Sequence, residues 1–192
     1  MKMLERLELA DFARPTLHVA RRLLGCVLCH RVGEELRRGR IVEVEAYTGD
    51  LASHAASGKR TPRNRIMFGP AGFAYVYFTY GMHHCFNVVT ETDNRPGAVL
   101  IRGLDGIAHA AGPALACRAL SLTLQDNGRN LITDPDLWIE PGRRQRGERI
   151  VQTTRIGIRR DVELPYRFYI LGSAGVSKRD RGAEARVITA TG

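Results

Sequence analysis

The sequence predicts a single α+β domain built from paired strands and a few short helices. The chain has 192 residues, a length that suits one domain with a substantial core. Two segments have the features of helices, and several others resemble short strands separated by glycine and proline turns. No repeat or low-complexity linker divides the chain, so we expect residues 1–192 to form one domain.

The first half of the chain is expected to contain one helix and four strands. Residues 15–24 carry apolar side chains on one helix face, with Pro15 at the start and Gly25 just past the end. Five glycines and prolines lie within 52–72, which indicates an irregular loop. Gly81-Met82 indicates the turn of a hairpin. The four strands are expected at 26–32, 39–47, 73–80 and 85–90.

The second half is expected to add one helix, three strands and a basic loop region. The helix is expected to begin at Gly112-Pro113 and to run to about residue 122, because the first turn of a helix tolerates proline. Beyond Asn127-Gly128 the chain becomes rich in loops, and residues 141–160 hold seven arginines and one acid, Glu148. The three strands are expected at 97–104, 155–160 and 166–171.

The charge of the chain indicates an anionic partner. The net charge is +9 and the pI is about 9.9, which favours a nucleic acid or an anionic membrane surface. No apolar run approaches the 18 or so residues of a membrane-spanning helix. The first residues carry acids and lack the apolar region of a secretory signal. We therefore expect a cytoplasmic protein, associated with the nucleoid if the source is bacterial, that does not bind membranes.

A basic, aromatic stretch favours nucleic acid as that partner. From Leu51 to Thr90 the chain contains no Asp or Glu, yet it holds seven of the 13 aromatic residues. A polyanion could lie on this stretch while bases stack on the rings. The side chains expected to contact the DNA backbone are Lys59, Arg60, Arg63 and Arg65, unless they form a merely solvated basic loop.

Two glutamates just upstream could supply chemistry. On the strand expected at 39–47, Glu43, Glu45 and Tyr47 share one face, and the intervening residues pack into the core. Two carboxylates about 7 Å apart on a strand could act as an acid and base pair. Taken alone, they could equally be solvated charges at a sheet edge.

The neighbouring rings favour the catalytic interpretation. A flipped purine needs flat partners on its faces, and Tyr47, His54 and Tyr77 could supply them. Tyr75 and Tyr77 should share one face of their strand, with Phe78 on the core face. Tyr80 lies at the expected hairpin tip, where it could enter the base stack as a wedge or fold back onto the core.

Neither metals nor other cofactors are expected. Cys26-Val-Leu-Cys29-His30 matches a haem-attachment pattern, but that chemistry requires an exported chain. His83-His84-Cys85 has no partner cluster at the spacing of metal ligands.

A series of short motifs runs through the chain in one order. They are Arg40-Ile-Val-Glu-Val-Glu-Ala-Tyr-Thr-Gly49, Ser53-His54-Ala55, Thr61-Pro62-Arg63-Asn64, Met67-Phe68-Gly69-Pro70, Ala74-Tyr-Val-Tyr77, Tyr80-Gly-Met82, Asn87-Val-Val89, Leu100-Ile-Arg102 and Arg155-Ile-Gly-Ile158. Together they resemble the alkyladenine (3-methylpurine) DNA glycosylase family. The resemblance is dense from about 39 to 104 and thinner over nearly all the rest.

The resemblance implies a role for each site residue. Glu45 matches the general base that activates water, and Arg102 matches an arginine near that water. The walls of the base pocket are matched by Tyr47, His54 and Tyr77, its floor by Asn87, and the intercalating residue by Tyr80. The implied fold is a compact domain around a curved, mainly antiparallel sheet with flanking helices and a protruding DNA-intercalating hairpin. The implied enzyme is monofunctional and free of cofactors, and we expect a monomer.

The chemistry implied is base excision. A member of the family flips alkylated purines such as 3-methyladenine and 7-methylguanine out of duplex DNA and hydrolyses the N-glycosidic bond. Such a base is already a good leaving group, so a water-activating carboxylate suffices. No lysine lies near Glu45 in sequence to act as a nucleophile.

Two other functions remain open at this stage. One is a non-catalytic nucleic-acid-binding module, which would gain nothing from Glu45. The other is a carbohydrate hydrolase that uses Glu43 and Glu45, which the net charge disfavours. Two features stay unassigned: the basic stretch 143–149, and the absence of a lysine that many relatives carry after Gly112-Pro113.

Overall fold

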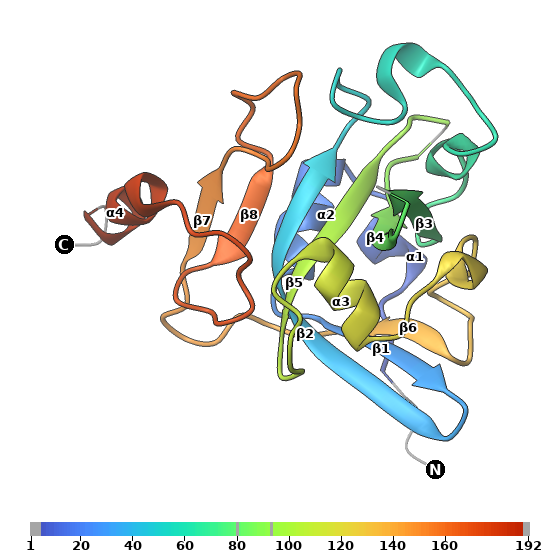
Figure 1. Cartoon of the computed structure of the whole chain (residues 1–192), viewed down its shortest axis with the longest axis horizontal. Coiled ribbons are helices and arrows are strands. Elements are labelled where there is room, and N and C mark those ends of the chain that lie inside the picture. The colour runs from blue at the N-terminus through green and yellow to red at the C-terminus, as the bar shows by residue number, and fades with distance from the viewer. Residues whose placement is uncertain (1–4, 80, 93, 190–192) are drawn as a thin grey trace.

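A curved antiparallel sheet organises the structure (Figure 1). The computed structural model describes residues 5–79, 81–92 and 94–189. The strands are β1 (Val27–Val32), β2 (Glu35–Tyr47), β3 (Ala74–Thr79), β4 (His83–Val89), β5 (Ala98–Asp105), β6 (Leu137–Glu140), β7 (Ile150–Thr153) and β8 (Arg167–Ile170). The helices are α1 (Leu9–Phe12), α2 (Thr16–Leu23), α3 (Pro113–Ala119) and α4 (Arg181–Thr189), with 3₁₀ turns η1 (Ala56–Gly58), η2 (Arg65–Phe68) and η3 (Leu124–Asp126).

The long strand β2 is the centre of this sheet. The strand order is β3-β4-β5-β2-β1-β6, and every pairing is antiparallel. The first part of β2 pairs with β1, whereas its last part pairs along the same edge with β8, which carries β7. Because β2 has neighbours on both edges, residues 41–46 are all buried.

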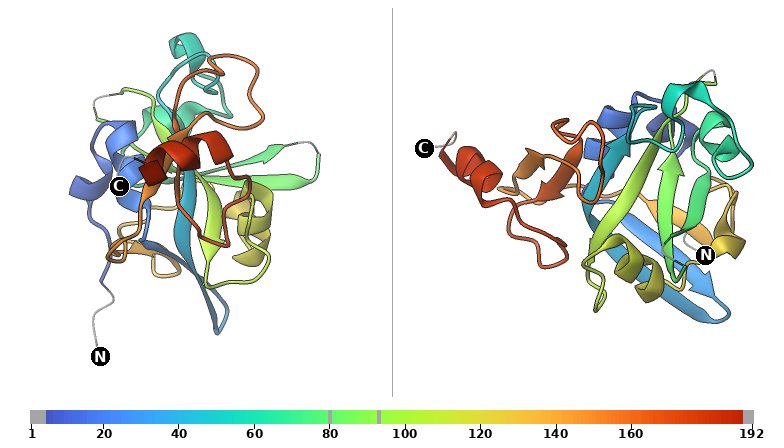
Figure 2. Two further views of the ribbon diagram at one scale, coloured as in Figure 1. Left: turned by 90° about the vertical axis from the view of Figure 1, so that its left-hand side faces the viewer. Right: turned by 45° about the horizontal axis from the view of Figure 1, so that its top comes forward.

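Helices cover the two faces of the sheet. Helix α2 packs on β2 and β5, and α3 packs on β4 and β5 from the other side (Figure 2). Helix α2 turns Val19, Ala20 and Leu23 into the core and is capped by Glu91, whose carboxylate accepts the Thr16 backbone N–H at 2.6 Å. A carboxylate at a helix N-terminus stabilises it through unpaired N–H groups and the helix dipole.

Most of the expected elements are confirmed. Helix α2, the strands β1 to β5 and strand β8 all lie where the sequence predicts them, although β2 begins four residues early at Glu35. Residues 52–72 form an irregular loop that contains two 3₁₀ turns. The single α+β domain with a curved antiparallel sheet is therefore the observed fold.

Three expectations are wrong. The strand expected at 155–160 is a loop, because the buried guanidinium of Arg155 turns away from the ladder to pair with Asp50, and the true strand β7 ends at Thr153. Helix α3 ends at Ala119, just before Ser121 adopts a φ of 55°. Phe78 is 41% exposed rather than in the core, since the end of the β3–β4 hairpin projects beyond the body (Figure 2).

Four elements were not expected at all. They are the short helix α1, the strands β6 and β7, and the C-terminal helix α4. Each is short or weakly amphipathic, so tertiary contacts rather than local periodicity define it.

Candidate active site

A cavity of about 540 Å³ opens where the end of β2 meets the β3–β4 hairpin. Loop residues 51–54, strand β5, the start of α3 and loop residues 156–160 complete its wall. The lining residues are Tyr47, Leu51, Ala52, His54, Met67, Tyr75, Tyr77, Thr79, Cys85, Asn87, Ala98, Leu100, Arg102, Pro113, Ile156, Gly157, Ile158, Arg159 and Arg160. The cavity therefore brings together five residues that the sequence singles out from distant parts of the chain.

Three of these residues are the rings proposed to hold a base. The His54 and Tyr77 ring centroids are 4.6 Å apart with planes at 72°, and Tyr47 lines the same cavity. The Tyr75 hydroxyl lies 2.8 Å from His54 Nδ1 and fixes the imidazole. Tyr75 is 1% exposed, and we did not identify it as a site residue, although the Ala74-Tyr-Val-Tyr77 block contains it.

The surroundings of His54 favour the neutral form of its imidazole. Its side chain lies at the exposed mouth of the cavity, where partial burial, and then the positive charge of Arg63, lower the pKa of the imidazole. A neutral ring does not repel a positively charged base.

Asn87 lies deeper in the same wall. It is 2% exposed on β4, and its side-chain amide donates to the Tyr75 carbonyl at 3.0 Å. This hydrogen bond holds the amide group in one orientation.

Glu45 is fully buried behind the cavity wall. Its Oε1 accepts the Ile156 N–H at 2.7 Å, and its Oε2 accepts the Tyr47 hydroxyl at 2.9 Å. Arg102 Nη1 lies 3.3 Å from Oε2. Burial raises the pKa of Glu45, and the charge of Arg102 partly offsets that rise. Because Tyr47, Arg102 and Ile156 all line the cavity, the carboxylate stands one side chain away from it.

Glu43 is also 0% exposed, so the solvated-edge interpretation of the two glutamates is wrong. The ladder between β2 and β5 shifts register on both sides of Glu43, opposite Gly103. Such a bulge re-aims side chains. Glu43 faces Arg102, Arg167 and Ser177, whereas Glu45 faces Tyr47 and Ile156.

Arg155 supports the Tyr47 ring from outside the cavity. Its guanidinium is fully buried, lies 4.8 Å from the ring centroid of Tyr47, and pairs with Asp50 at 2.7 Å. Although burial opposes it, the hydrogen bond from Arg155 lowers the pKa of Asp50. We predicted no role for Arg155 itself, although it begins the block Arg155-Ile-Gly-Ile158.

The basic loop lies beside the cavity mouth, and its four basic side chains are all exposed. Arg63 stacks 5.2 Å from the Tyr77 ring centroid, and Arg60 lies 4.7 Å from that of Phe68. The side chains of Lys59 and Arg65 form no hydrogen bond or ion pair with the described residues. Arg159 and Arg160, which we did not predict as site residues, add positive charge at the mouth.

The wedge proposed at the hairpin tip cannot be placed, because Tyr80 lies outside the described residues. The neighbouring Met82 is 69% exposed, and Thr79 lines the cavity. The hairpin thus projects from the rim of the cavity (Figure 2).

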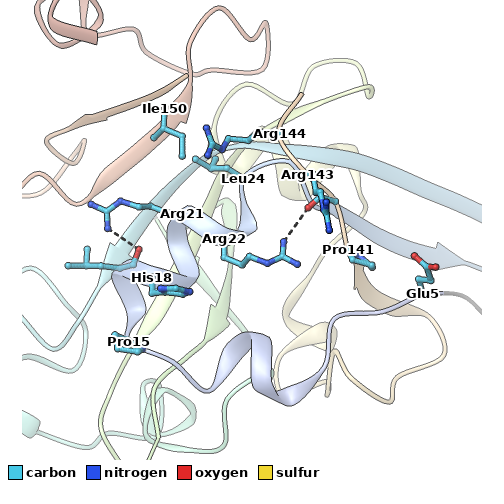
Figure 3. A pocket seen from close by; sticks show the side chains of 12 residues that line it. Glu5, Pro15, His18, Arg21, Arg22, Leu24, Pro141, Arg143, Arg144 and Ile150 are labelled. Carbon is cyan, nitrogen blue, oxygen red and sulfur yellow. Dashed lines mark hydrogen bonds between the residues drawn. The ribbon is translucent and has the colours of Figure 1, made fainter. Parts of the chain in front are cut away.

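A larger cavity of about 1100 Å³ lies on the α2 side of the sheet (Figure 3). Arg21 and Arg22 of α2 face Arg143 and Arg144 across it, over an apolar floor. Among its lining residues there is no tyrosine, phenylalanine or tryptophan, and its one acid, Glu5, is exposed. It lacks both the stacking rings and the buried carboxylate of the smaller cavity, which is therefore the candidate site.

Two kinds of feature are absent from residues 5–79, 81–92 and 94–189. No three His, Cys, Asp or Glu side chains gather in a group that could hold a metal ion. No helix in the same part of the chain is long and apolar enough to cross a membrane.

Comparison with known proteins gives a consistent result. Residues 10–174 match the methylpurine-DNA glycosylase (MPG) family. A protein of Methanoculleus marisnigri is 46% identical over 88% of this chain and 97% of its own length, and one of Carboxydothermus hydrogenoformans is 45% identical over 88% and 96%. A Myxococcus xanthus protein is 46% identical over 87% and 91%. The names of all three assign them provisionally as 3-methyladenine DNA glycosylases. This chain belongs to the methylpurine-DNA glycosylase family.

Proposed function

We propose that this chain excises alkylated purines, 3-methyladenine and 7-methylguanine among them, from duplex DNA. It flips the damaged nucleotide into the smaller cavity and hydrolyses the N-glycosidic bond. The observation that carries the proposal is the fully buried carboxylate of Glu45, in contact with three residues of an aromatic cavity wall. A buried carboxylate beside a cavity is unfavourable for folding alone and is typical of a site that performs chemistry.

The cavity suits a cationic purine. Tyr47, His54 and Tyr77 offer ring faces and edges on which a flat base can stack. A purine alkylated at N3 or N7 carries positive charge, which aromatic faces attract. Neutral His54 adds no repulsion. Asn87 at the inner wall then disfavours a purine with a 2-amino group.

Glu45 supplies the base for hydrolysis. It takes a proton from water, the water oxygen bonds to the anomeric carbon, and the electrons of the breaking C–N bond neutralise the positive charge of the purine. The products are a free neutral base and an abasic site. The negative charge of Glu45 also stabilises the cationic sugar of the transition state. Because its pKa is raised, Glu45 is a stronger base than an ordinary carboxylate.

Tyr47 and Arg102 orient this carboxylate. Burial, followed by the charge of Glu45, raises the pKa of Tyr47, so its hydroxyl remains a donor. Both side chains contact Oε2 of Glu45 and line the cavity.

The alternatives fit these contacts less well. A non-catalytic binding module gains nothing from burying Glu45. A carbohydrate hydrolase needs a second carboxyl group that can donate a proton, but Glu43 already accepts four hydrogen bonds from Arg102, Arg167 and Ser177.

The direct test uses a duplex with a single N7-methylguanine. We expect the purified protein to release the free methylated base and leave an abasic site, with the same rate in the presence of a metal chelator. Tight binding without release would favour the binding module. Sedimentation of the complex is expected to show one chain per lesion, and in a bacterium this activity would operate at the nucleoid.

A further inference from the structure

We propose that Glu43 is a positioning residue, which binds Arg102 in competition with Glu45 and thereby sets the proton affinity of the catalytic carboxylate. This inference rests on the proposed function. It assigns a role in the reaction to Glu43 and to Ser177, which lies in the segment after β8.

Both carboxylate oxygens of Glu43 accept hydrogen bonds within the protein. Its Oε1 accepts from Arg167 Nη1 at 2.9 Å, from the Ser177 hydroxyl at 2.9 Å and from Arg102 Nε at 3.3 Å, and its Oε2 accepts the Ser177 N–H at 2.6 Å. An ionised carboxylate has about four acceptor positions. With four donors and no exposure, Glu43 can bind neither water nor substrate.

One guanidinium joins the two glutamates. Arg102 directs Nε to Glu43, Nη1 to Glu45 at 3.3 Å, and Nη2 to the Ser177 hydroxyl at 3.4 Å. The guanidinium is planar and rigid, so fixing the Nε side also fixes the Nη1 side. Glu43 and Ser177 thus determine where Arg102 stands relative to Glu45.

Arg167 completes the charge balance of this network. It donates to the carbonyls of Thr154 and Lys178, and its third described contact is Glu43. Glu43 therefore shares its negative charge between Arg102 and Arg167. Without the negative charge of Glu43, Arg102 would form its ion pair with Glu45 alone.

The network depends on a close approach of the 175–177 segment to β5. A Cβ at Gly103 would lie 2.1 Å from the Gly175 carbonyl oxygen, and the Gly175 N–H donates to Asp105 at 2.7 Å. Only glycine at 103 lets the segment bring Ser177 onto Glu43. The position of residues 175–177 against β5 therefore depends on glycine at 103.

Two effects on Glu45 follow for a Glu43→Gln variant. In the variant, Glu45 loses the negative charge of Glu43, which raises the pKa of Glu45 in the native protein. Glu45 also gains the undivided attraction of Arg102, which lowers this pKa. Both effects lower the pKa of Glu45 and make it a weaker base. We expect the acid limb of the pH–rate profile to move down by about one pH unit. We expect the rate of base release to fall roughly 10- to 100-fold.

The experiment measures single-turnover release of N7-methylguanine from a duplex between pH 5 and 9, together with duplex affinity. The matched control is Glu184→Gln, another buried carboxylate, which binds Tyr169 and Arg179 away from the cavity. The control is expected to keep both the rate and the acid limb. A slower Glu43→Gln enzyme with an unmoved limb, or one with an unchanged rate, would overturn the proposal.

Ser177→Ala gives a second test if Glu43→Gln fails to fold. Without the hydroxyl, Glu43 Oε1 keeps only Arg167 and Arg102 as donors and binds Arg102 more strongly. The pKa of Glu45 should therefore rise, and the acid limb should move up slightly. A downward shift or no shift would contradict the role of Ser177. Suppose that Glu45→Gln loses activity while the acid limb of the pH–rate profile stays in place in Glu43→Gln and Ser177→Ala. That result would refute the role of Glu43 but not the proposed function. Full activity of Glu45→Gln would refute the proposed function.

Discussion

Two cavities of this molecule, one beside α2 and one at the end of β2, differ in what their walls contain. The α2-side cavity is about twice as large and is edged by four arginines, whereas the smaller one has tyrosines, an asparagine and a buried ion network. Positive charge and size alone would select the larger cavity. The comparison shows that a buried carboxylate held against an aromatic wall is the more specific mark of a catalytic site.

The difference arises from the kind of backbone that builds each wall. In the smaller cavity, four strands and the bulge at Glu43 fix most of the polar side chains by ladder register. The α2-side cavity lies between a helix and the loop 141–144, which is held by a close contact between Gly25 and Gly142. Sites on strands are positioned more precisely than sites on loops.

The largest expected effect is on the rate of base release, and it should distinguish the two cavities. Glu45→Gln should reduce base release by roughly 100-fold or more, because it removes the base and the negative charge beside the cationic sugar. Duplex affinity should change little. Single-turnover kinetics on an N7-methylguanine duplex measure both. Arg144→Ala, in the other cavity, should leave the rate unchanged, and a comparable loss in that variant would remove the distinction.

The pH dependence should follow the raised pKa of Glu45. A general base works only when it is ionised, so the rate should fall as the pH drops below that pKa, by about tenfold per unit. Since burial raises this pKa above its usual 4.5, the fall should begin at a higher pH than for an exposed glutamate. A rate that is constant down to pH 5 would show that Glu45 is not the group that titrates.

A smaller effect should appear in base selectivity. Asn87→Ser shortens the side chain and removes the amide that binds the Tyr75 carbonyl, so purines with a 2-amino group should be released roughly tenfold faster relative to adenine lesions. The matched control is Asn127→Ser, which alters an asparagine that binds the backbone of Val76 outside the cavity. Competition between methylated adenine and guanine duplexes measures the ratio. An unchanged ratio in Asn87→Ser would place discrimination elsewhere.

Much of this comparison could be predicted from the sequence, and particular residues show why the rest could not. Strand periodicity places Glu43, Glu45 and Tyr47 together, and the resemblance supplies the roles of His54, Tyr77 and Asn87. Neither the periodicity nor the resemblance shows that Glu43 accepts hydrogen bonds from three residues more than 50 positions away in the sequence.

Arg155 illustrates the same limit. A segment of alternating apolar residues after an arginine resembles a strand, and we expected one at 155–160. The ion pair between Arg155 and Asp50, 105 residues apart, overrides that local pattern. Long-range burial of charge is not visible in periodicity.

The smallest expected effect concerns which face lies on the DNA backbone. The side chains of Lys59 and Arg65 are exposed and form no hydrogen bond or ion pair with the described residues. They are therefore free to displace counterions from phosphates. Replacing both with alanine should lower the slope of log affinity against log salt by about one unit per lost contact. Replacing Arg143 and Arg144 with alanine removes the same charge from the other cavity and should leave the slope unchanged. Fluorescence anisotropy with an undamaged duplex at several salt concentrations gives both slopes. Equal reductions would mean that overall charge, not a defined face, controls binding, and a larger reduction for the Arg143 and Arg144 pair would place the duplex on the α2 side of the sheet.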